Sequence, residues 1–181
     1  MAYSSGKYLP ETLAGNVYIG STAAAGVAAP ISTGTAVTFG LWNTNPNKIA
    51  IPLWLNIGFT SGTIALGMFG IANQACGFAI GTAAPLSAFT AGTPKNAYLG
   101  QGGSSMSFTP SAATLTAGGT AAMFLPGANE SATAGTGING LTWDFNGSLI
   151  VPPGQLIFVC GSVAQTGIFT MSMAWAEVPI V

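Results

Sequence analysis

Apolar residues alternate with other residues along one long stretch, residues 49–59. A period of two is the side-chain period of a β-strand, because successive side chains point to opposite faces. The stretch therefore predicts a strand with one buried face, and this face fixes the register, since a slip of one residue would expose all of it. The apolar set is Ile49, Ile51, Leu53, Leu55, Ile57 and Phe59.

A turn follows this strand at residues 60–63, where Gly62 is free to take positive φ. The chain then returns as a second apolar run, residues 64–71. We predict that the two segments form the central hairpin of a β-sheet and that shorter strands are added around it.

Shorter runs predict further strands along the rest of the chain. In residues 168–178, Phe169, Met171, Met173 and Trp175 share one face. No window combines a period of 3.6 with helix caps. About eight to ten short strands predict an all-β protein, an antiparallel β-sandwich of the jelly-roll type. The other candidate strands are residues 16–20, 35–42, 77–80, 95–99, 105–109, 112–116, 120–125, 141–145 and 155–160.

Turn residues separate these strands. Asparagine and proline predict a turn at residues 43–47. Asn146-Gly147 is a strong hairpin signal, because a type I′ turn needs positive φ at both central residues. Residues 1–14 have no periodic pattern and predict an extended N-terminal arm, either packed on a neighbouring subunit or frayed. Residues 15–181 then form a single β-sandwich domain.

Charge is scarce: three Lys or Arg and four Asp or Glu make seven charged residues among 181, and the net charge is −1. Because net charge keeps proteins apart in solution, this composition predicts a subunit of an assembly; a monomer with a neutral surface is the alternative. Three lysines cannot form a basic patch, so we expect no nucleic-acid partner.

Residues 49–94 are uncharged and long enough for two membrane-spanning helices. Glycines, Pro52, Asn56, Asn73 and Gln74 interrupt this stretch, and its period of two is not that of a helix. We therefore expect no membrane partner. The N-terminal residues lack the apolar core of a signal peptide.

Catalytic chemistry has little support in the sequence. Without histidine there is no Ser-His or Cys-His pair. A Ser-Lys pair would need a buried lysine, whereas each of the three lysines lies near a predicted arm, turn or loop, where a solvated lysine is expected. Glu130 and Asp144 are a formal carboxylate pair, but Asp144 is better explained as a turn residue. We expect no enzyme activity, no cofactor and no metal site.

Cys76 and Cys160 predict two buried thiols, with a disulfide as the alternative that only geometry could decide. The four tryptophans are expected to be core aromatics, although each could also stack on a sugar. Trp54 lies on the face of its strand opposite the apolar set, which makes it the candidate ligand or partner contact.

Three segments carry a resemblance: LWNTNPNKIAIPLWLNIGFTSGT at residues 41–63, GSLIVPPGQLIFVCG at 147–161, and WAEVP at 175–179. They resemble the small β-rich structural proteins encoded in tailed-phage and marine viral genomes. The resemblance implies a virion component made in the host cytoplasm, a jelly-roll subunit that forms homotrimers and contacts the major capsid protein. Glu177 would then be a rare charge at an interface, or an ordinary exposed residue near the terminus.

Three functions follow as hypotheses. The first is a non-enzymatic virion structural protein, a capsid decoration, cement or minor capsid subunit that forms homo-oligomers. The second is a receptor- or glycan-binding head of a fibre or spike that uses Trp54. The third is a bacterial surface or pore-forming β protein.

Overall fold

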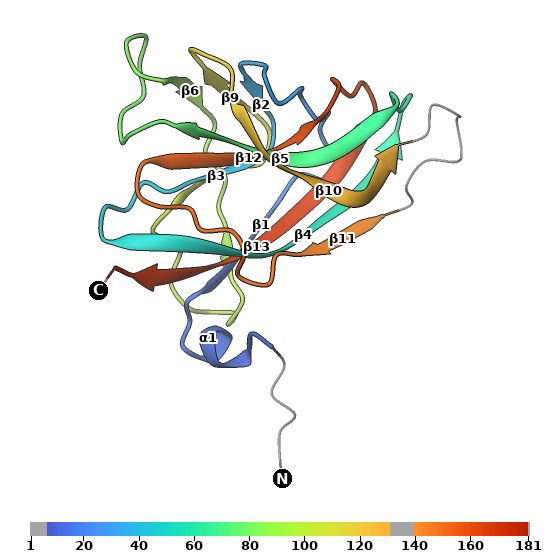
Figure 1. Cartoon of the computed structure of the whole chain (residues 1–181). Coiled ribbons are helices and arrows are strands. Elements are labelled where there is room, and N and C mark those ends of the chain that lie inside the picture. The colour runs from blue at the N-terminus through green and yellow to red at the C-terminus, as the bar shows by residue number, and fades with distance from the viewer. Residues whose placement is uncertain (1–6, 131–139, 181) are drawn as a thin grey trace.

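The structure is a computed structural model that describes residues 7–130 and 140–180, with side chains left aside at 126–130. Within these residues the chain forms thirteen strands and one short helix (Figure 1). The elements are α1 (Leu9–Leu13), β1 (Val17–Ser21), β2 (Ala36–Val37), β3 (Gly40–Trp42), β4 (Lys48–Ser61), β5 (Gly67–Ala75), β6 (Leu86–Phe89), β7 (Lys95–Asn96), β8 (Ser107–Thr109), β9 (Ala113–Leu115), β10 (Thr120–Glu130), β11 (Leu141–Asp144), β12 (Gln155–Gly161) and β13 (Ile168–Pro179).

The strands form two five-stranded sheets and one small sheet. Sheet A has the order β11-β4-β13-β1-β7, sheet B the order β10-β5-β12-β3-β8, and sheet C the order β2-β9-β6. All ladders between named strands are antiparallel. Sheets A and B face each other, and sheet C lies beyond sheet B (Figure 1). The predicted all-β antiparallel sandwich is therefore confirmed.

The main core lies between sheets A and B and is rich in aromatic rings. The apolar face predicted for β13 is buried there, with Phe169, Met171, Met173 and Trp175 all exposed by 2% or less. Phe69 of sheet B meets Phe169 edge to face, with ring centroids 4.9 Å apart. Such contacts between rings of opposing sheets fix how the two sheets pack.

A second core lies between sheets B and C. The inner strands of sheet B are covered on both faces, which explains why β12 is buried at Leu156 through Gly161 instead of alternating. Cys76 and Cys160 both lie in this second core as free, buried thiols, as predicted. Cys160 pairs with Gly70, whereas Cys76 lies six residues further along the chain, just past the end of β5. Six residues of strand span roughly 20 Å, so the two thiols cannot form a disulfide.

The predicted central hairpin is wrong. β4 lies in sheet A between β11 and β13, while β5 lies in sheet B between β10 and β12. The connection crosses the sandwich: Ile64 is buried in the main core, and the Gln165 side chain bonds the backbone N–H and C=O of Ala65. Gly62 does take positive φ, but the turn it makes leads to the other sheet.

The single apolar face predicted for β4 is also wrong, because the strand contains a β-bulge. Trp54 pairs with Ala174 and Pro52 pairs with Trp175, so Leu53 is an extra residue without a partner in β13. The bulge lets Leu53 and its neighbour Trp54 share the outer face of sheet A.

The faces of β4 therefore exchange at the bulge. Leu55 and Ile57 point into the main core as predicted, but before the bulge it is Ala50 that does so. Ile51 and Leu53 instead belong to a small apolar cluster on the outer face of sheet A. The sequence pattern continues through the bulge unbroken and gives no sign of it.

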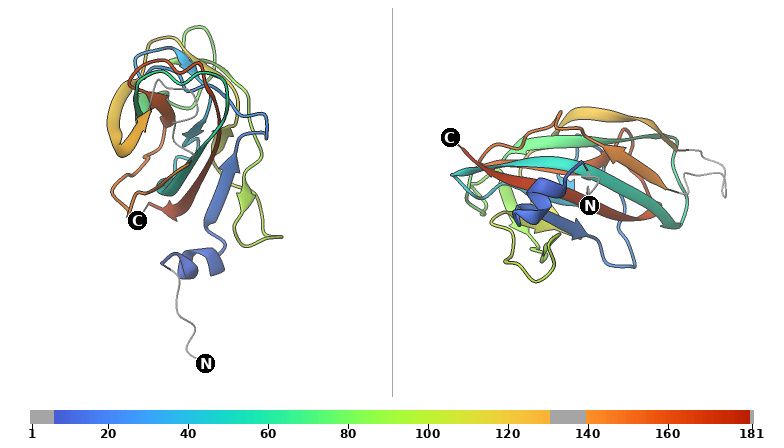
Figure 2. Two further views of the ribbon diagram at one scale, coloured as in Figure 1. Left: turned by 90° about the vertical axis from the view of Figure 1, so that its right-hand side faces the viewer. Right: turned by 90° about the horizontal axis from the view of Figure 1, so that it is seen from below.

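The N-terminal arm is not fully extended where it is described. Residues Leu9–Leu13 form the short helix α1, with Pro10 near its start and Gly15 at positive φ just after its end. Proline at the start and glycine after the end are the residues that helix ends favour. A helix of five residues is too short to show a periodic pattern in the sequence. Seen from below, α1 lies in front of sheet A (Figure 2).

Smaller differences concern loops. The segment predicted as a strand at 77–80 is a turn, and β6 forms in a stretch predicted to be a loop. Asn146 and Gly147 both have positive φ, as a type I′ turn requires. However, the chain after this turn leaves β11 and pairs at Val151 with Ala50 of β4, so no hairpin forms.

Candidate functional site

The three segments that carry the viral resemblance meet at one corner of the molecule. Asn43 is fully buried there, and its amide donates hydrogen bonds to the carbonyls of Lys48 (2.8 Å) and Val151 (2.9 Å). Its backbone carbonyl accepts a bond from Gly154 of the Pro-Pro-Gly turn. Asn43 thus joins the first segment to the second and holds this corner of the fold together.

Glu177 of the third segment is buried at the same corner, with 1% exposure, which corrects both expectations for it. Its carboxylate accepts hydrogen bonds from both hydroxyls of Ser104 and Ser105 and from the Ser105 backbone N–H. The Lys48 ammonium lies 3.3 Å from Oε2. A buried carboxylate needs such donors, so Glu177 ties the segment before β8 to sheet A.

A second polar cluster holds the N-terminal arm on sheet A. The Asp144 carboxylate accepts hydrogen bonds from the Lys7 ammonium (3.0 Å), the Tyr8 hydroxyl (2.7 Å) and the Asn146 backbone N–H (2.8 Å). Lys7 also bonds the Asn146 side-chain oxygen. The turn role predicted for Asp144 is confirmed by its bond to Asn146, and the arm contact was not predicted.

The hydrogen bonds of this cluster shift the pKa values of its members. The Tyr8 hydrogen bond, more than the Lys7 contact, lowers the pKa of Asp144, while the bond to Asp144 raises the pKa of Lys7. The lysine therefore stays protonated at neutral pH and is not a nucleophile. The Glu130 side chain, the other member of the carboxylate pair considered above, lies outside the described residues.

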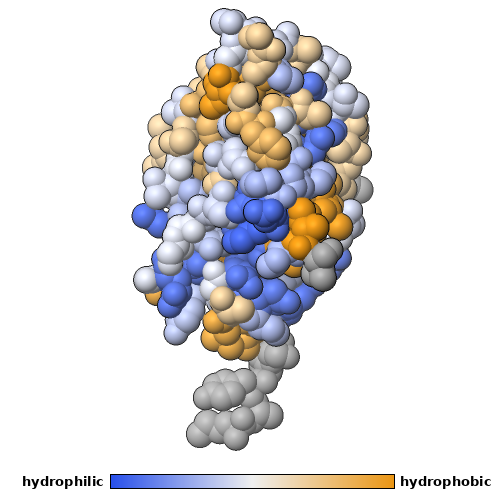
Figure 3. All heavy atoms as spheres, turned by 90° about the vertical axis from the view of Figure 1, so that its left-hand side faces the viewer, coloured by the Kyte–Doolittle hydropathy of each residue, from blue (hydrophilic) through white to orange (hydrophobic). Residues whose placement is uncertain are grey.

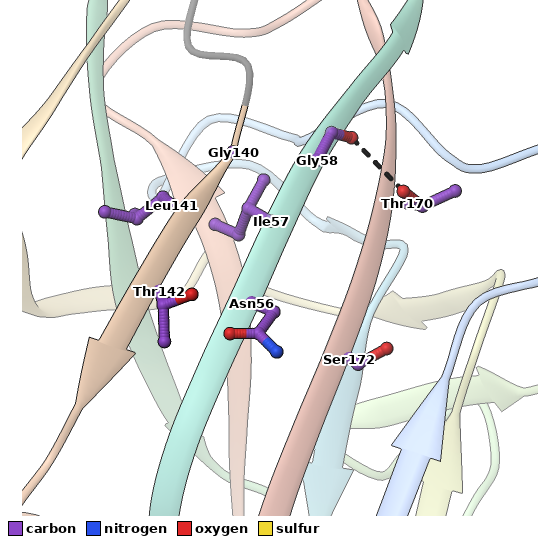
Figure 4. Close-up of a pocket in the computed structure, with 8 residues that line it drawn as sticks. All are labelled: Asn56, Ile57, Gly58, Gly140, Leu141, Thr142, Thr170 and Ser172. Carbon is purple, nitrogen blue, oxygen red and sulfur yellow. Dashed lines mark hydrogen bonds between the residues drawn. The ribbon is translucent and has the colours of Figure 1, made fainter.

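A polar groove opens on the outer face of sheet A beyond the bulge. A row of four polar residues crosses four adjacent strands there: Thr142, Asn56, Ser172 and Ser21 pair in that order. Figure 4 shows the Asn56 amide between Thr142 and Ser172, with Thr170 bonded to the Gly58 carbonyl beside it. The hollow measures about 400 Å³, and none of its lining residues is charged.

One atom in this groove lacks a partner. The Oδ1 atom of Asn56 is buried and accepts no hydrogen bond from any described residue. A buried acceptor without a donor is costly and rare in proteins. By contrast, the Ser21 and Ser172 hydroxyls bond each other at 2.8 Å, so the far end of the row is satisfied.

Trp54, the predicted contact residue, lies on this outer face, two residues before Asn56. It is partly buried against Leu53 and Ala174. Trp42 and Trp175 are core aromatics, as expected, and Trp143 packs against the main core. Trp54 is thus the tryptophan that the fold places outside the cores between the sheets, and its role as a ligand contact stays a prediction.

The cysteines are poor candidates for chemistry. Burial raises the pKa of Cys76 to about 11 and that of Cys160 to about 12. A thiol is nucleophilic as the thiolate, so both are unreactive near neutral pH. Among the described residues no cluster of metal-ligating side chains occurs.

An apolar loop, residues 76–85, projects beside β6 (Figure 1). Its base is held by hydrogen bonds from the Trp42 indole to Gly77 (2.9 Å) and from Gly81 to Leu86 (3.0 Å). Between these anchored glycines, Phe78 is exposed by 55% and Ile80 by 50%. The space-filling view of the left-hand face shows hydrophobic residues in separate patches, with the most hydrophilic residues toward the middle and lower part (Figure 3).

Comparisons with known proteins give no relative: no family model, no curated protein and no solved structure matches the chain. Within residues 7–130 and 140–180, no helix has the length and apolar character needed to cross a bilayer. The resemblance to viral structural proteins therefore rests on the three sequence segments alone.

Proposed function

We propose that this protein is a non-enzymatic structural subunit that associates with copies of itself, and that it serves in a virion as a capsid decoration, cement or minor capsid protein. The observation that carries the proposal is the apolar loop 76–85, which presents two large side chains to solvent on a chain with seven charged residues. Exposed apolar groups on a nearly uncharged surface favour association.

We expect the loop to pack against a second copy of the chain. Hydrogen bonds anchor the loop at Gly77 and Gly81, on either side of Phe78 and Ile80, so these two residues lose little conformational freedom on binding. Its ten residues carry no charge, which suits the apolar centre of a subunit interface. A homotrimer that contacts the major capsid protein is the form the resemblance implies.

Two further features support a virion role. Residues of all three resembling segments interlock around Asn43 and Glu177, which is what a shared structural element would require. The strand orders β1-β13-β4-β11 and β3-β12-β5-β10 support a jelly-roll assignment for the sandwich, since a jelly roll winds eight strands into two sheets.

The test is the mass of the purified protein in detergent-free buffer, measured by light scattering behind a sizing column. We expect a discrete oligomer, and a trimer in particular. The double variant Phe78→Ser/Ile80→Ser should shift the mass to that of the monomer, because it removes the apolar contact without touching either core.

Leu66→Ser is the matched control, since Leu66 is 66% exposed and lies at the opposite end of β5 from the loop. It should leave the mass unchanged. A wild-type monomer, or a double variant that stays oligomeric, would contradict the proposal.

A further inference from the structure

We propose that the groove on the outer face of sheet A is a binding site for a neutral saccharide, with Asn56 as its central hydrogen-bonding residue. This inference is independent of the proposed self-association, which uses the loop 76–85. It starts from the buried Oδ1 atom of Asn56, which has no donor among the described residues. Rotation of the Asn56 amide would turn this covered atom toward the groove, where a ligand hydroxyl would supply the missing donor.

The neutral hydrogen-bonding groups of the groove favour a neutral, hydroxyl-rich ligand. Its side chains offer amide and hydroxyl groups, which donate and accept, and none of the lining residues is charged. The nearby Asp144 carboxylate is already engaged by Lys7 and Tyr8. Such a surface gives a charged ligand no counter-ion, whereas a sugar ring presents several neutral hydroxyls that match both kinds of group.

The dimensions also fit a short chain of sugar rings. The polar row crosses four strands, which spans about 14 Å at the usual interstrand spacing. The hollow of about 400 Å³ lies within the usual range for small-molecule sites. Gly58 keeps the floor open, because a Cβ there would lie 3.1 Å from the Thr170 hydroxyl.

Trp54 supplies the apolar part of the site. It occupies the cross-strand row next to Asn56, on the same face, with the small Ala174 as its neighbour in β13. The apolar face of a sugar ring can pack on an indole placed beside hydrogen-bonding groups. The β4 bulge thus places an aromatic ring beside the polar row.

The experiment is an NMR titration of the full chain with neutral trisaccharides of glucose, galactose, mannose or N-acetylglucosamine. A concentration of about 10 mM saturates a site whose Kd is about 1 mM. We expect at least one saccharide to shift the Asn56 side-chain amide and the backbone signals of Thr142 and Ser172. Asn56→Ala should raise the Kd about tenfold through the lost hydrogen bond.

Gly58→Ala should weaken binding too, by filling the floor without removing a polar group. Asn47→Ala changes an exposed asparagine in the turn before β4 and should leave the Kd unchanged. The proposal is overturned if no saccharide shifts the groove signals, or if Asn56→Ala and Gly58→Ala both bind as the wild type does. A circular-dichroism spectrum of each variant confirms that it is folded.

Discussion

At the scale of single residues, the buried carboxylate of Glu177 joins parts of the chain that are far apart in sequence. It contacts Ser104, Ser105 and Lys48, which come from two distant parts of the chain. A lone charge has no periodic pattern, so its burial could not be read from the sequence. Four hydrogen bonds from two serines make the position sensitive to substitution.

Glu177→Ala should lower the free energy of unfolding by about 3 kcal/mol, because it leaves buried serine donors unpaired. Glu177→Gln should cost less, since one acceptor oxygen remains. Urea denaturation of both variants measures the change. Glu11→Ala removes an exposed acid and should change the free energy by less than about 0.5 kcal/mol. Equal effects of Glu177→Ala and Glu11→Ala would contradict the structural role.

At the scale of elements, the sequence predicted the strands better than their partners. The prediction for β13 was correct, because apolar and small residues alternate without a break over its core-facing positions. The predicted β4–β5 hairpin was wrong because the two strands pair with later strands, β4 with β11 and β13 and β5 with β10 and β12. These partners lie at least 45 residues after β5 in sequence, so no local pattern indicates them. The bulge at Leu53 also escaped prediction, because both faces of β4 before it are apolar.

The N-terminal arm gives a prediction at this scale. Asp144→Asn should free residues 7–15 from sheet A, because the amide cannot replace the carboxylate that holds Lys7 and Tyr8. Trypsin cleaves after lysine, and the other two lysines begin strands β4 and β7. Cleavage after Lys7, followed by mass spectrometry, should therefore be several-fold faster in the variant. Unchanged cleavage would mean that the arm is held by the packing of Tyr8 on the outer face of sheet A.

The same contact has a defined pH dependence. Because the folded protein lowers the pKa of Asp144 below its usual 3.8, the contact is fully present above that value and is lost as the pH falls through the lowered pKa. The Tyr8 ring signals in NMR should therefore stay constant from neutral pH to about 4 and move only below it. A change that begins near pH 6 would assign the transition to another group.

At the scale of the whole molecule, sheets A, B and C form three layers with a core between each pair of neighbours. Both cysteines lie in the core between sheets B and C, so their reactivity measures how often this core opens. Because burial raises both pKa values to about 11 or above, neither thiol should react with a disulfide reagent at neutral pH, and both should react in denaturant. Asn47→Cys, in the exposed turn before β4, should react at once as a control. Rapid labelling of both thiols in the native protein would mean that sheet C opens separately from the sandwich.

The candidate groove was beyond sequence reasoning for a similar reason. Its row is assembled from residues 21, 56, 142 and 172, four isolated polar positions on strands far apart in the chain. Trp54 could be singled out because it stood out of phase within one strand. What could not be seen was the pairing that brings Thr142 and Ser172 to either side of Asn56.

The short strands at the edges of the sheets reduce the risk of aggregation that comes with a nearly uncharged chain. Unpaired sheet edges recruit other chains into fibrils, and most proteins repel them with charge, which this chain largely lacks. Here the edges are made poor templates instead: β7 has two residues, β8 three and β11 four, and the longer β10 is broken by two register shifts. Geometry therefore protects against aggregation where charge does not, and lengthening an edge strand would be more dangerous than neutralising a lysine.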